Sequence, residues 1–123
     1  MNLTGRWKYK EDYGYGATQG ELYLEQNGEE LVGRLVFSDT VMDEKPYMLQ
    51  EFLRGKIDGR RVTLDAFEYD IIFADFDVSY ELDHWCGMLE KEDKITGVSV
   101  DVQGVQGDFE FVKYDDTLPF KIF

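Results

Sequence analysis

The stretch Gly20–Leu24, with sequence GELYL, is followed by Asn27-Gly28 and then by Leu31–Leu35, with sequence LVGRL. In both stretches a glycine or an apolar residue stands at every second position, which is the period of a strand with one buried face. Asn-Gly between two such stretches is a strong short-range signal for a hairpin. Residues 20–35 therefore predict two antiparallel strands joined by a tight turn.

The same pattern returns twice in variant form. In each copy, alternating apolar residues and glycines lead into a turn, and the alternation resumes after the turn. The second copy is Leu53–Ile57, Asp58-Gly59 and Val62–Leu64, and the third is Gly87–Leu89, the charged turn Glu90–Lys94 and Ile95–Gly97. The chain therefore reads as a series of antiparallel hairpins.

Extending the alternation along the whole chain predicts eight strands. We expect a bend or bulge at Asp70–Asp75 and a kink near His84–Gly87, and no stretch has the apolar spacing of a helix, so helix content should stay under about 15%. Short links favour a closed up-and-down antiparallel β-barrel over a Greek-key sandwich, so the fold class is all-β. The expected strands are Leu3–Glu11, Thr18–Gln26, Glu30–Phe37, Tyr47–Ile57, Arg61–Tyr69, Phe76–Leu89, Lys94–Val102 and Gly107–Tyr114.

Length and charge limit the function classes. The 123 residues fit one domain, residues 1–123, and the formal net charge is −13. Such a surface repels nucleic acid and anionic membranes, because binding to both depends on Lys and Arg. We expect neither as a partner. The acidic residues are expected to form a solvated surface, with a patch for a basic partner as the alternative.

Cysteine usage and the chain start indicate the compartment. Cys86 is the one cysteine, so an intrachain disulfide is ruled out. The start of the sequence shows no signal peptide, and no apolar run reaches the length of a membrane helix. We expect a cytoplasmic protein, with a mature secreted form as the alternative.

Gly5-Arg6-Trp7 at the head of the first expected strand resembles the Gly-x-Trp signature of the lipocalins and the wider calycin superfamily. Residues 24–33, LEQNGEELVG, are similar to hairpins of small bacterial lipocalin-like domains. The resemblance implies that Trp7 closes one end of the barrel and that a basic residue of the last strand, here Lys113, packs on it. The long helix that follows the last strand in typical lipocalins is absent.

The same alternation predicts which side chains face the barrel interior. Gly20, Gly33, Gly55 and Gly97 share the inward parity, and we expect them to leave space. An eight-stranded barrel is just wide enough to be filled by side chains or to hold one small ligand, and both alternatives stay open. The expected inward residues are Trp7, Leu22, Leu24, Leu31, Leu35, Phe37, Leu49, Leu53, Ile57, Val62, Leu64, Ala66, Tyr80, Leu82, Leu89, Ile95, Phe109 and Phe111.

Two glutamates, Glu51 and Glu68, also have the inward parity. A buried carboxylate is costly unless it is paired, near the mouth or functional. The structural alternative is a register shift or bulge that turns them outward; the functional one is a polar hook for a ligand. The candidate ligand-binding residues are Glu51, Arg54, Glu68, Tyr80, Phe109 and Phe111.

The remaining candidate chemistry is sparse. His84-Trp85-Cys86 gathers the one histidine and the one cysteine, which cannot by themselves supply the ligands of a zinc site. We expect this segment to pack at a strand kink. Asp75-x-Asp77 and Asp115-Asp116 lack the spacing of a calcium loop. We therefore expect neither metal nor cofactor, and no catalytic residues.

The sequence favours a barrel that binds a small, largely apolar molecule in its interior or at its mouth, without enzymatic activity. A filled barrel that acts as an interaction or assembly module is the first alternative, and a barrel isomerase or cyclase is the second. In the interaction module, the apolar tail 118–123 or an outer aromatic face would make the contact, for example in a homodimer. The aromatic candidates are Tyr13, Tyr15, Tyr23, Phe67 and Tyr69.

Overall fold

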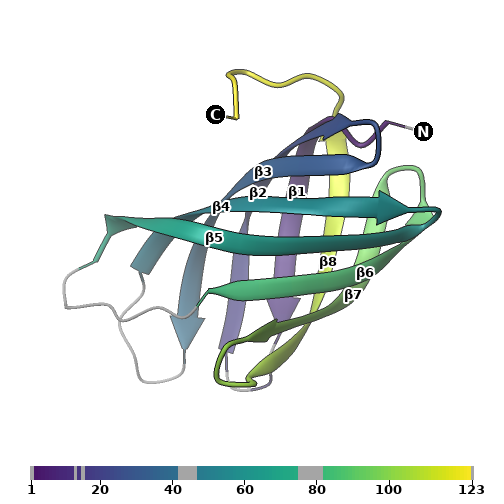
Figure 1. Cartoon of the computed structure of the whole chain (residues 1–123). Helices are drawn as coiled ribbons and strands as arrows, with labels where there is room; N and C mark the ends of the chain where they lie inside the picture. Colours follow the sequence, from purple (N-terminus) through teal and green to yellow (C-terminus); the bar gives the residue numbers. More distant parts are fainter. Residues whose placement is uncertain (1, 13, 15, 42–46, 75–81, 123) are drawn as a thin grey trace.

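The computed structural model describes residues 2–12, 14, 16–41, 47–74 and 82–122 and confirms the predicted fold class. The strands form one closed antiparallel barrel in which each pairs with its neighbours in the chain and the last pairs with the first (Figure 1). They are β1 (Gly5–Asp12), β2 (Gly16–Asn27), β3 (Glu30–Val41), β4 (Tyr47–Asp58), β5 (Arg61–Phe73), β6 (Asp83–Lys91), β7 (Lys94–Asp101) and β8 (Gln106–Asp115).

The two ends of the barrel differ. Three two-residue hairpin loops and both chain termini lie at one end, which we call the terminal end; the opposite end is the far end (Figure 1). Gly28 and Gly59 open two of these loops with φ angles of 63° and 60°, a left-handed conformation that glycine adopts without steric cost. The Asn-Gly and Asp-Gly signals therefore mark the turns at which the chain reverses.

Three strand boundaries differ from those predicted by more than two residues. β3 continues to Val41 and β5 to Phe73. The bend or bulge expected at Asp70–Asp75 is present as a bulge within β5: Leu49 pairs with Ile71 and Met48 with Phe73, so Ile72 is an extra residue in the ladder. β6 begins at Asp83, whereas residues 76–81 of the predicted strand lie outside the described residues. Pairing with β4 keeps Asp70–Phe73 in the sheet.

A β-bulge interrupts the alternation of β5. Leu53 pairs with Ala66 and Phe52 with Glu68, so Phe67 is an extra residue in the ladder. Beyond the bulge the parity reverses. Glu68 points outward and is exposed, while Tyr69 lies opposite Glu51 and packs against the core.

The inward glycines allow strands to approach closely; they do not create empty space. A Cβ atom on Gly55 would lie 1.8 Å from the carbonyl oxygen of Thr63, and one on Gly97 would lie 2.1 Å from that of Cys86. Gly97 also faces Gly87 directly across β6 and β7, with the ring of Phe109 over Gly87. The expectation that these glycines leave space is wrong where a Cβ would meet the neighbouring backbone, as at Gly55 and Gly97, whereas their role in the sharp bends of a small barrel is consistent with the geometry.

The predicted tail docking is found on the barrel's own outer wall. Ile122 is only 1% exposed, and its carbonyl oxygen accepts a 2.6 Å hydrogen bond from Arg34 Nε. The Phe120 ring packs on Tyr23 at 4.7 Å between ring centroids and lies 4.8 Å from the Arg34 guanidinium. Because Tyr23 is covered by the tail, it does not contribute to a free aromatic face.

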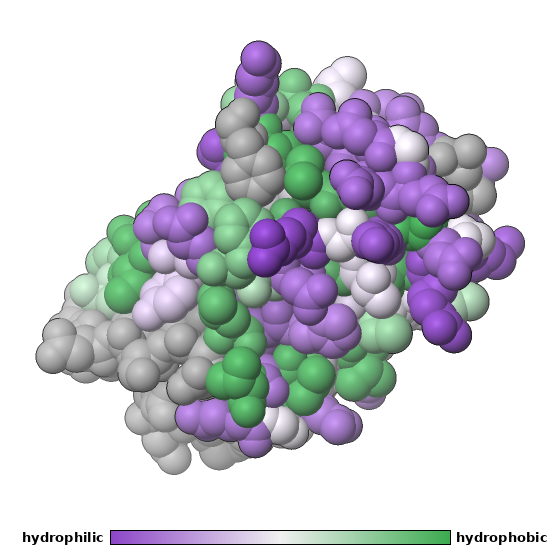
Figure 2. Space-filling view, viewed as in Figure 1, coloured by the Kyte–Doolittle hydropathy of each residue, from purple (hydrophilic) through white to green (hydrophobic). Residues whose placement is uncertain are grey.

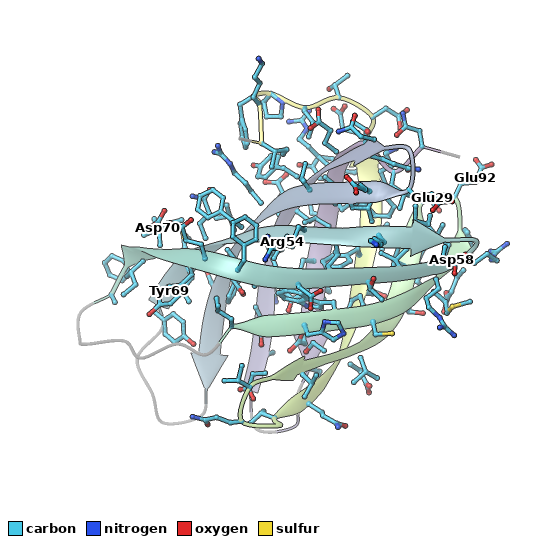
Figure 3. The ribbon with its side chains drawn as sticks, in the orientation of Figure 1. Glu29, Arg54, Asp58, Tyr69, Asp70 and Glu92 are labelled. Carbon is cyan, nitrogen blue, oxygen red and sulfur yellow. The ribbon has the colours of Figure 1, made fainter. Side chains whose placement is uncertain are left out.

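The outer wall carries mostly polar residues. Figure 2 shows hydrophilic side chains over much of one face, interrupted by apolar ones. Glu29, Asp58 and Glu92 lie at the hairpin tips of the terminal end, well away from Tyr69 and Asp70 (Figure 3). None of the described segments forms a helix that could cross a membrane.

Candidate functional site

The terminal end of the barrel is closed by Trp7. Its side chain is completely buried, and its Nε1 donates a 3.0 Å hydrogen bond to the Leu3 carbonyl oxygen. Lys113, which pairs with Trp7 across β1 and β8, places its Nζ 5.8 Å from the centroid of the Trp7 ring. At Gly5, with φ of 146°, a Cβ atom would lie 2.2 Å from the Asp115 carbonyl oxygen, so this position needs glycine.

The interior at the terminal end is filled with apolar side chains. Leucines from five strands pack around Trp7 and leave no buried polar residue among the described positions there. This half of the barrel is a conventional core. The residues that form it are Leu3, Trp7, Leu22, Leu24, Leu31, Leu35, Leu53, Ile57, Val62, Leu64, Leu89, Ile95 and Phe111.

The interior toward the far end has a different chemistry, and we call it the distal half. Thr18, Glu51 and Ser99 are the buried polar residues of the described chain, and all of them lie here. They sit among aromatic rings, which gives the mixture of apolar wall and few polar groups that is typical of small-molecule sites. The distal half consists of Tyr9, Glu11, Thr18, Phe37, Leu49, Glu51, Tyr69, Asp83, Trp85, Ser99 and Phe109.

Tyr9 lies at the centre of the distal half. Its ring makes edge contacts with Phe37 and Trp85, with centroids 6.2 and 6.4 Å away, and a tilted contact with Phe111 at 5.2 Å. Its hydroxyl donates a 2.6 Å hydrogen bond to Glu11 Oε1. Three aromatic contacts and one charged acceptor fix the position of this ring.

The electrostatics around Tyr9 are strongly negative. Burial, the charge of Glu11 and the hydrogen bond to Glu11 raise the pKa of Tyr9 well above its ordinary value of 10.0. The charge of Asp83 acts in the same direction, so its carboxylate also faces this part of the interior. Tyr9 is therefore a neutral donor at physiological pH.

Glu51 faces the interior as predicted. It lies between Leu49 and Leu53 on β4, is fully buried, and has Leu35 and Tyr69 as its cross-strand neighbours. A carboxylate in such surroundings is costly unless its contacts compensate for lost hydration. Its place in the wall is set by the unbroken alternation of β4.

Trp85 brings a polar atom without a hydrogen bond into the same region. The side chain is 1% exposed, and within the described part of the chain its Nε1 makes no hydrogen bond of normal geometry. The indole N–H lies close enough to the Tyr9 hydroxyl to lower its pKa slightly, against the larger raising effects. With the Tyr9 hydroxyl nearby but no hydrogen bond of normal geometry, this buried donor is poorly satisfied, which costs stability.

The structure brings only part of the predicted ligand-binding set together. Glu51, Phe109 and Phe111 face the interior, but Arg54 and Glu68 do not. Arg54 lies on the outer surface of β4, with its guanidinium 5.0 Å from the Phe67 ring (Figure 3). The bulge at Phe67 turns Glu68 outward, which is the structural alternative that the sequence left open, so Glu68 does not belong to the interior set. Tyr80 lies outside the described residues.

Several interior residues were not predicted. Tyr9 and Glu11 share the parity of Trp7, and Asp83 and Trp85 share that of Leu89, so simple extension of the alternation identifies them. The expected kink near His84–Gly87 obscured the second pair. The buried Ser99 follows in the same way from Ile95 and Gly97.

The one histidine and the one cysteine are on the outer wall. His84 Nδ1 contacts the Asp65 carboxylate across β5 and β6, and Cys86 is exposed. Only Trp85 of this segment packs in the core. The described residues contain no group of His, Cys, Asp and Glu that could hold a metal ion.

A second concave feature lies on the outside of the barrel. A groove of about 670 Å³ follows the outer faces of β7, β8, β1 and β2 and is lined in part by Lys10, Ala17, Val98 and Asp108. Its lining is mixed and charged. It is the main rival to the interior as a ligand site, and experiments must distinguish the two.

No family model and no curated protein matches this sequence. Among solved structures, it is similar to the redesigned β-barrel mFAP1 bound to DFHBI, with 11% identity and a TM-score of 0.64, covering 90% of this chain and 94% of that chain. It is also similar to a de novo designed fluorescence-activating β-barrel, with 12% identity and a TM-score of 0.54, covering 92% of this chain and 94% of that chain. At this identity the similarity shows the fold, an eight-stranded antiparallel barrel, and nothing finer.

Proposed function

We propose that this protein binds a small, largely apolar molecule in the distal half of the barrel and does not chemically transform it. The observation that carries the proposal is the contrast between the two halves of the interior. Leucines and Trp7 fill one half, whereas the other combines Tyr9, Phe37 and Trp85 with buried polar groups. A barrel that served only as a scaffold would not need polar groups at such positions.

Two further observations support the proposal. The redesigned barrels mFAP1 and mFAP0, which have the same fold, are each bound to DFHBI, so a barrel of this architecture can hold a small molecule. For binding without turnover, the support is the position of His84 and Cys86 on the outer wall, away from the interior carboxylates.

The test is a titration with N-phenyl-naphthylamine, an uncharged dye that becomes fluorescent in apolar surroundings. Ser99 is 2% exposed inside the distal half, and its neighbour Val98 is 44% exposed on the outer wall and lines the groove there. Ser99→Leu should fill the site and weaken dye binding by at least about tenfold. Val98→Leu adds the same side chain outside and should leave affinity unchanged.

Saturable dye binding that Ser99→Leu removes, with both variants still folded by thermal melting, is the expected result. If Val98→Leu weakens binding and Ser99→Leu does not, the dye occupies the outer groove and the proposal is wrong. An absence of saturable binding would also contradict it.

One observation favours protein interaction as a second candidate function. Phe67, Ile71, Ile72 and Phe73 are all exposed on β5, by 37–54%. In the described chain, pairing of β5 with β6 ends at Asp65, opposite His84, so these residues belong to a part of β5 that extends beyond that ladder. Exposed apolar residues on such a strand are typical of interaction sites.

Sedimentation of the wild-type protein and of Ile72→Lys tests this candidate. A concentration-dependent dimer that Ile72→Lys converts to a monomer would support it. The control is Val102→Lys, because Val102 is 73% exposed in a turn at the far end. A wild-type monomer at all concentrations would exclude self-association.

A further inference from the structure

The distal half has a one-sided charge. Glu11, Glu51 and Asp83 all belong to it, and their carboxylates come from β1, β4 and β6. The Glu11 carboxylate lies over Gly107, where an added Cβ would be 2.8 Å from Oε2, and it accepts the hydrogen bond of the Tyr9 hydroxyl. Three separate strands thus contribute acidic groups of inward parity to the distal half.

Basic side chains are placed elsewhere. Among the described lysines and arginines, only Lys113 has the inward position, and it lies at the terminal end beside Trp7. Lys8 and Lys10 alternate with the inward residues of β1 and point outward, and Arg34 and Arg54 lie on the outer wall. Low-dielectric walls lined by one sign of charge focus the field and favour a ligand of the opposite sign.

The buried indole N–H of Trp85 is a second, independent observation that points to a ligand. Its Nε1 is buried in the distal half and makes no hydrogen bond with the described residues. A bound molecule with an oxygen or nitrogen acceptor at this point would satisfy it. The Tyr9 ring lies 6.4 Å from the Trp85 ring and in turn contacts Phe37 and Phe111, which gives an aromatic wall suited to a flat apolar body.

We infer that the ligand of the distal half is a small aromatic molecule with a cationic nitrogen, such as a protonated amine or amidine, and an acceptor atom that reaches Trp85. This inference rests on the proposed function and specifies its ligand class. The carboxylates of Glu11, Glu51 and Asp83 attract the cationic nitrogen, and the aromatic rings contact the apolar body.

Three dyes of similar size test the inference: the cation thioflavin T, the uncharged N-phenyl-naphthylamine and the anion anilinonaphthalene sulfonate. The wild-type protein should bind thioflavin T at least about tenfold more tightly than the anion. Glu51→Gln and Glu11→Gln should each weaken thioflavin T binding by several-fold or more while the uncharged dye is retained. Glu25→Gln changes the net charge equally on the outer wall of β2 and should have little effect.

The outcomes separate the two proposals. If the uncharged dye binds but the cation has no advantage over the anion, the ligand class is wrong and the binding function stands. If Glu25→Gln weakens thioflavin T as much as the interior variants do, overall charge explains the preference and the inference fails. If none of the dyes binds, both proposals fail. If thermal melting shows that Glu51→Gln does not fold, the test relies on Glu11→Gln.

Discussion

The hydroxyl of Tyr9 and the carboxylate of Glu11, two residues apart on the same face of β1, are joined by a 2.6 Å hydrogen bond inside the barrel. The same spacing allows a similar contact on the outer wall of β2, where the Tyr23 hydroxyl donates a 3.1 Å hydrogen bond to Glu21 Oε2. Inside the barrel, aromatic contacts hold the Tyr9 ring in place. The Glu11 carboxylate lies over Gly107, in space that a side chain at that position would occupy.

This pair predicts an unusual alkaline titration. Because burial and Glu11 raise the pKa of Tyr9, the folded protein keeps this proton above pH 10.0, where the unfolded chain releases it. The free energy of unfolding should therefore fall as pH rises above that value. Tyr9→Phe should lack this part of the pH dependence. The ultraviolet absorbance of phenolate, recorded against pH for the wild-type protein and for Tyr9→Phe, measures the ionisation of Tyr9. Equal phenolate yields from Tyr9 and the exposed tyrosines in the folded state would contradict the assignment.

Trp7 should be a major source of stability. It is fully buried and its Nε1 is bonded to Leu3, so Trp7→Ala should lower the free energy of unfolding by about 3–5 kcal/mol. Urea unfolding measures the loss. Tyr114→Ala, which removes a 45% exposed ring from the outer wall of the neighbouring strand, is the control and should cost much less. Similar losses for both would show that Trp7 does not close the barrel.

The tail should stabilise the monomer. Its turn begins where Asp115 Oδ1 accepts hydrogen bonds from the backbone N–H of Thr117 at 2.8 Å and from its hydroxyl at 2.6 Å. Ending the chain at Thr117 removes the buried Ile122, and full burial of such a side chain contributes about 1.5–3 kcal/mol. The free energy of unfolding should fall by about that amount without a change in oligomeric state. Lys121→Ala, at an exposed tail position, is the control.

Gly55 should tolerate no side chain. A Cβ at this position would lie 1.8 Å from the Thr63 carbonyl oxygen, so Gly55→Ala must separate β4 from β5 and should cost about 1–3 kcal/mol or more. Lys56→Ala, at the next and exposed position, should be nearly neutral. Unfolding in urea compares the two; a neutral Gly55→Ala would show that the strands can adjust their spacing freely.

The barrel follows from local signals in the sequence. Alternation and the Asn-Gly and Asp-Gly turns specify neighbouring pairs, and closure of β1 on β8 then buries the inward face of every strand. The position of Glu51 could be predicted because β4 alternates without interruption over the relevant residues. Glu68 could not, because one extra residue, Phe67, reverses the parity of β5 and no local pattern reports it.

The interior chemistry was predicted less completely. The glycines were expected to leave space, but the closeness of Thr63 to Gly55 depends on how sharply the sheet coils, which is a property of the whole barrel. Trp85 and Asp83 were missed because a kink was assumed, although β6 pairs with β7 in regular register from Asp83 to Leu89. The approach of β4 and β5 at Gly55 depends on the register between strands, which the sequence of one strand does not contain, whereas Asp83 and Trp85 follow from the alternation of β6 itself.

The central claim, that a ligand enters the distal half, is tested most directly by nuclear magnetic resonance. The chain has two tryptophans, so its ¹H–¹⁵N spectrum contains two indole signals, and Trp85→Phe assigns them. Trp85 Nε1 lies in the distal half, whereas Trp7 Nε1 is bonded to Leu3 at the terminal end and serves as an internal control. Titration with N-phenyl-naphthylamine should shift the Trp85 signal saturably and leave the Trp7 signal in place. An unmoved Trp85 signal at saturating dye, or equal shifts of both signals, would contradict the account.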